Sequence, residues 1–165
     1  MEEPSPRIPA SSLILGYGPV LPLPVAAVMA WTLAAPVPTV VTWLAIWWGA
    51  AILIFLAGVR RGLSFRGDAE VTAAPLVAMI WLFLLGAGAL VAATPLVSLV
   101  LLAIGYASVA ILDPMAASRG EAPPHFARLR PPQMGIALLG LIGLILHGPC
   151  WRCRSDGLLP PSRGG

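Results

Sequence analysis

Two cysteines and two histidines are the residues of this sequence whose types are most often used for redox or metal chemistry. Cys150 and Cys153 have the CxxC spacing found in redox proteins and at the start of many zinc sites. No second ligand pair accompanies them, and no strand of the thioredoxin type precedes them. The alternative is a disordered tail over 148–165, because glycine, proline and arginine become frequent after Leu146.

The histidines, His125 and His147, fall on opposite faces of a membrane if the apolar segments cross it. A shared metal would need both ring nitrogens about 2 Å away, so a ligand pair is not expected. The sequence also has no glycine-rich phosphate loop with its lysine, no nucleophile elbow and no paired carboxylates in one segment. We therefore expect no metal and no cofactor, and the sequence leans away from an enzyme.

The composition indicates a membrane protein. Of the 165 residues, 58% are hydrophobic and only 10% are charged, whereas an ordinary soluble domain has about 25% charged residues. The net charge is +3, and all ten basic residues are arginines. They fall in the connections and terminal segments, and no basic stretch there suggests a nucleic-acid surface, so we expect membrane lipids and other membrane proteins as partners, and no nucleic acid.

Five apolar segments approach the length of about 20 residues that crosses a hydrocarbon core about 30 Å thick. The sequence thus predicts an all-α fold, a polytopic membrane bundle of five transmembrane helices. One domain would cover 13–147, after a cytoplasmic N-terminal segment at 1–12. The predicted helices are 13–34, 39–59, 74–93, 95–112 and 131–147.

The last of these segments leaves two alternatives open. Its apolar core covers only 134–146, and a helix over 131–147 would be about 25 Å long. It could cross where the bilayer thins or if the helix continues towards Trp151. Otherwise it would be a re-entrant or surface-lying helix.

Prolines interrupt the first segment, at Pro19, Pro22 and Pro24. Because proline lacks an N–H group and clashes with the preceding turn, we expect irregular backbone from Gly16 to Pro24 and a regular helix from about Val25. Interrupted helices often line binding sites in membrane carriers.

The arginines indicate which side of the membrane is cytoplasmic. If all five segments cross, the N-terminus and the connections at 60–73 and 113–133 lie together, and the positive-inside rule makes that side cytoplasmic. If the fifth segment does not cross, the tail joins them. The seven arginines of the shared side are Arg7, Arg60, Arg61, Arg66, Arg119, Arg128 and Arg130, and the tail has Arg152, Arg154 and Arg163.

Three stretches resemble the transmembrane-protein-69-like family: LGYGPVLPLP, WWGAAILIFLAGVRRG, and LD followed by PPHFARLRPPQMG. These are small membrane proteins of bacteria, with relatives in mitochondria, whose shared domain has no assigned activity. The resemblance covers about 12–146 and implies a bacterial cytoplasmic membrane. Its motif positions here are Gly58, Arg60, Gly62, Asp113 and Arg130, and the family usually has tryptophan where this chain has Arg61.

Two functions are compatible with these features. The first is a noncatalytic membrane component that acts through helix or lipid contacts, with Gly58 and Gly62 spaced to admit a neighbouring helix. Asp113 would then pair with Arg128 or Arg130 across the connection, or these arginines would hold an anion or a lipid headgroup. The alternative is a small permease or lipid-handling protein. It would use the broken first segment at Gly16, Pro19 and Pro22.

Overall fold

The computed structural model describes residues 17–64, 73–118 and 124–155, with the backbone alone at 60–61, 63–64, 73–74, 116–118, 124–130 and 149–155. Within these ranges all regular secondary structure is helical, which confirms the predicted all-α class. The helices are α2 (Pro22–Thr32), α3 (Val37–Ser64), α4 (Ala73–Val91), α5 (Pro95–Ser118) and α6 (Pro124–Ser155).

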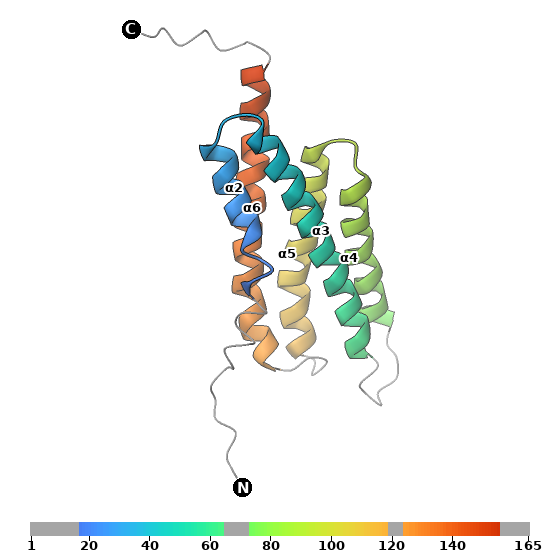
Figure 1. Ribbon diagram of the computed structural model, residues 1–165. Coiled ribbons are helices and arrows are strands. Elements are labelled where there is room, and N and C mark those ends of the chain that lie inside the picture. Colours follow the sequence, from blue (N-terminus) through green and yellow to red (C-terminus); the bar gives the residue numbers. More distant parts are fainter. Residues whose placement is uncertain (1–16, 65–72, 119–123, 156–165) are drawn as a thin grey trace, which may run out of the picture.

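The helices form a bundle in which successive helices run in opposite directions (Figure 1). Helices α2 and α6 lie on one side, α4 lies on the other, and α3 and α5 lie between them. Direct contacts join α2 to α3 and α6, α5 to α4 and α6, and α3 to α4 and α5. The α2–α3 and α4–α5 connections are at one end of the bundle, which α6 extends beyond.

Three of these helices contain stretches long and apolar enough to cross a membrane: Val37–Val59, Pro95–Met115 and Pro131–Gly148. The stretches at Pro22–Thr32 and Pro75–Val91 are also apolar but shorter. At 1.5 Å per residue, the 23 residues of Val37–Val59 are about 35 Å long, which exceeds a hydrocarbon core of about 30 Å. A membrane bundle therefore fits the helix lengths, and five crossings stay a prediction.

Several helix boundaries differ from those predicted. Helix α5 continues to Ser118 rather than ending at 112, and α6 extends from Pro124 to Ser155 rather than over 131–147. Helix α6 thus continues over 148–155, where a disordered tail was predicted, while 156–165 lie outside the described residues. The prediction followed apolar length, but a helix that has started gains one backbone hydrogen bond with each added residue, whether or not that residue is apolar.

The short connections have conventional local geometry. Thr94 precedes α5, and its hydroxyl oxygen accepts a hydrogen bond from the Val97 amide at 3.4 Å, so it caps the helix that Pro95 begins. On the other connection at this end, the Val37 amide donates to the Ala34 carbonyl oxygen at 3.2 Å, and the Ala35–Pro36 peptide is cis. These two turns define the end where α2 meets α3 and α4 meets α5.

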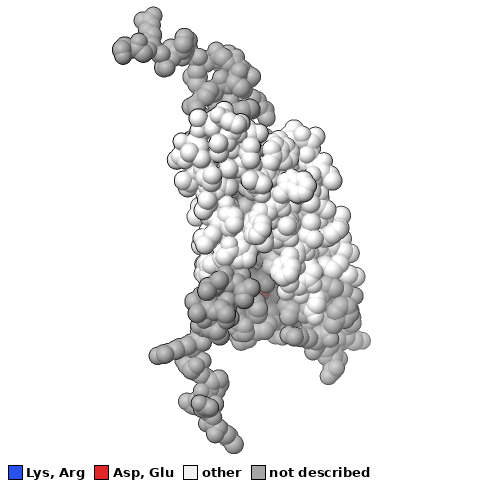
Figure 2. Space-filling model, viewed as in Figure 1, with Lys and Arg blue, Asp and Glu red and all other residues white. Residues whose placement is uncertain are grey.

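The interior and the exterior of the bundle are both apolar. Figure 2 shows that the described surface on one side has almost no acidic or basic residues. Large apolar side chains are widely exposed, including Val91 at 83% and Leu139 at 70%. In a membrane such a surface faces lipid, and helix association then depends on close packing and interhelical hydrogen bonds rather than on the hydrophobic effect. The functional residues must therefore be sought among those contacts.

Candidate functional site

A turn precedes α2 and interrupts the first apolar segment. Residues 18–21 form a turn, in which the amides of Val20 and Leu21 donate to the Tyr17 carbonyl oxygen at 3.0 and 3.2 Å. The Leu23 amide then donates to the Val20 carbonyl oxygen at 3.3 Å. Helix α2 begins at Pro22, so regular structure starts slightly earlier than the predicted Val25. Gly16 lies outside the described residues.

The prolines reduce the cost of this interruption. A helix start normally leaves amide N–H groups without acceptors, which is costly where water is absent. Pro19, Pro22 and Pro24 have no N–H group to leave unpaired. The intervening amides of Val20 and Leu23 are bonded within the turn, and Pro22 is placed where its fixed φ favours a helix start. These bonded amides are thus not free to bind an anion.

A tryptophan of the next helix donates a hydrogen bond to a carbonyl oxygen of the turn. The indole Nε1–H of Trp48, on α3, donates to the Pro19 carbonyl oxygen at 2.7 Å. Trp48 lies near the middle of the apolar stretch Val37–Val59, so this bond would lie deep in a membrane. The carbonyl oxygen of Pro19 thus accepts a hydrogen bond from another part of the chain, and its role as a channel or lipid contact stays a prediction.

The backbone of α6 packs directly against the first turn of α2. A Cβ atom placed on Gly140 would lie 2.6 Å from both the Leu23 carbonyl carbon and the Pro24 nitrogen. One turn further along α6, a Cβ on Gly143 would lie 3.1 Å from the Cβ of Ala27. Only glycine therefore permits this approach of α6 to α2. The close contact between the two helices also leaves no space at this point for a substrate.

Another tryptophan, Trp31 in the last turn of α2, joins α2 to α6. The indole N–H of Trp31 donates to the Gly143 carbonyl oxygen at 3.0 Å. The His147 ring meets the Trp31 ring edge to face, with the ring centroids 5.5 Å apart and the planes at 69°. His147 thus has a packing role against α2. The side chains of His125, Cys150 and Cys153, which were considered as ligands and not expected to bind a metal, lie outside the described part of the structure.

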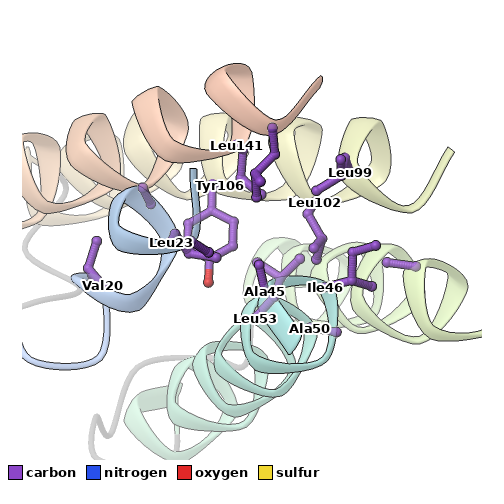
Figure 3. Packing of buried hydrophobic residues seen from close by; sticks show 14 of the residues in the cluster. Val20, Leu23, Ala45, Ile46, Ala50, Leu53, Leu99, Leu102, Tyr106 and Leu141 are labelled. Atoms are coloured by element: carbon purple, nitrogen blue, oxygen red, sulfur yellow. The ribbon is translucent and has the colours of Figure 1, made fainter. Parts of the chain in front are cut away.

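The centre of the bundle is held by a buried tyrosine. The Tyr106 hydroxyl, on α5, donates to the Gly49 carbonyl oxygen of α3 at 3.1 Å, and Tyr106 is fully buried. On the same pair of helices, Leu53 of α3 packs so closely on Gly105 that a Cβ there would overlap it. Figure 3 shows Tyr106 among the buried apolar residues of the core. This core is filled by side chains of the chain itself.

The motif residues of the stretch WWGAAILIFLAGVRRG are not packed in the core. Gly58 and Gly62 are exposed, and nothing lies within 4 Å of a Cβ built on either one. Among the described residues, therefore, no helix of this chain packs where the spacing predicted a close neighbour. The side chain of Arg60 lies outside the described part of the structure, so its assignment as a motif position stays a prediction.

Asp113 lies in the last part of α5, where its side chain is half-buried and engaged in an interaction. The predicted pairing with Arg128 or Arg130 is not tested, because those side chains lie outside the described residues. On α6, Gln133 is 6% exposed. Across the described residues, no buried side-chain nitrogen or oxygen lacks a hydrogen-bond partner, and no group of three or more potential metal ligands occurs.

Sequence reasoning missed the tertiary partners of the tryptophans, of Tyr106 and of Gly140. The residue types gave one usable signal, since a tryptophan or tyrosine donor in an apolar helix needs an acceptor. The acceptors are backbone carbonyl oxygens at Gly49 and Gly143 and at Pro19, which no side-chain pattern marks.

Comparison of the chain with protein-family models, with curated protein sequences and with solved structures gave no match.

Proposed function

We propose that this chain is a five-crossing protein of a bacterial cytoplasmic membrane and acts as a noncatalytic component through helix or lipid contacts. The N-terminus and the connections 60–73 and 113–133 face the cytoplasm. Three helices of sufficient length and apolarity support the membrane placement, and the arginine distribution supports the orientation. The resemblance to the transmembrane-protein-69-like family agrees with this proposal.

The packing around Gly140 is the observation that favours a noncatalytic role. At the level where a broken helix could expose polar backbone to a substrate, α6 lies against Leu23 and Pro24 with no room for one added methyl group. The Trp48 indole occupies the Pro19 carbonyl oxygen at the same break. These contacts count against the alternative of a permease or lipid-handling protein that binds at Gly16, Pro19 and Pro22.

Mass spectrometry of the gently solubilised protein tests this proposal. We expect lipids or another membrane protein to copurify in fixed proportion. A matched variant, Gly140→Leu, opens the α2–α6 contact. A noncatalytic component should lose its copurifying molecules when this contact fails, while Gly135→Leu, at an open position of the same helix, should retain them. Saturable solute uptake by liposomes containing the wild-type protein would instead support the permease.

A further inference from the structure

We draw no further inference here: the strongest candidate, the exposed apolar face of α3 around Trp47 and Ala51, carries none because nothing in the described part of the structure shows what covers it.

Discussion

The Tyr106 hydroxyl of α5 and the Gly49 carbonyl oxygen of α3 are joined by a buried hydrogen bond of 3.1 Å. They are 57 residues apart in the sequence. The bond lies among apolar side chains, and a Cβ on Gly49 would lie 3.1 Å from Leu102 Cδ1 of the same helix α5. It therefore specifies which turn of α5 faces which turn of α3, where apolar packing alone would tolerate several registers.

Removal of this bond should cost little, because the ring of Tyr106 stays in place. Tyr106→Phe should lower the free energy of unfolding by about 0.6 kcal/mol, and at most ~1.7 kcal/mol, as for other interhelical bonds in membranes. Tyr106→Ala leaves a cavity as well and should cost about 3–5 kcal/mol. Reversible unfolding in mixed micelles measures both. Similar losses in the two variants would mean that the hydroxyl, rather than the ring, stabilises the core.

Gly140 should be the least tolerant glycine of α6. An added Cβ would meet the backbone at Leu23 and Pro24, which cannot rotate away, so Gly140→Ala should destabilise the bundle by about 1–3 kcal/mol. Gly135→Ala is the matched control on the same helix, with open space at the Cβ position. It should be neutral or stabilising by up to about 1 kcal/mol through helix propensity. Thermal unfolding of both variants checks this, and equal shifts would contradict the close α2–α6 approach.

Trp48 should stabilise the turn before α2 against local opening. Trp48→Phe removes the donor to the Pro19 carbonyl oxygen and leaves that acceptor unpaired among apolar groups. We expect faster hydrogen exchange at the Val20 and Leu21 amides, by about tenfold for a loss of ~1.4 kcal/mol. Mass spectrometry of exchanged peptides measures this. Exchange in α5 peptides serves as the internal control, and a uniform increase there would indicate global destabilisation instead of a local effect.

Arg60 and Arg61 should differ in sensitivity. In the transmembrane-protein-69-like family, which the stretch WWGAAILIFLAGVRRG resembles, arginine is retained at the position of Arg60. Tryptophan is usual there at the position of Arg61. Bidentate binding of phosphate or of Asp113 needs the planar guanidinium group, so Arg60→Lys should lower thermal stability in detergent. Arg61→Lys should be nearly silent, and Arg61→Trp should be tolerated at a membrane interface. Equal small shifts at both positions would mean that the two arginines only anchor the helix end electrostatically.

The arginine distribution predicts which side each connection faces. In a variant without Cys150 and Cys153, cysteines at Ser64 and Ser118 should be protected from an impermeant thiol reagent added outside intact cells. A cysteine at Ala35, in the α2–α3 connection at the opposite end of the bundle, should react. Protection of Ala35→Cys together with labelling of the other two positions would reverse the orientation.

The sequence by itself determined that this chain is helical, where most of its helices begin, and that prolines interrupt the first. Apolar length and proline predict the starts of α3, α4 and α5 to within two residues, because proline favours the first turn of a helix and ends what precedes it. They could not predict the full extent of α6, where a polar sequence continues an established helix to Ser155.

Only the tertiary structure decided which side chains face inward. In a soluble protein, polarity separates the core from the surface, but here Leu53 is buried and Phe55 is 66% exposed although both side chains are apolar. The same limit applies to glycine: Gly140 is packed against backbone, and Gly58 is open. What distinguishes such positions is the close approach of helices distant in sequence, such as α2 and α6. That approach depends on shape and on hydrogen bonds to backbone carbonyl oxygens, neither of which a pattern of apolar residues records.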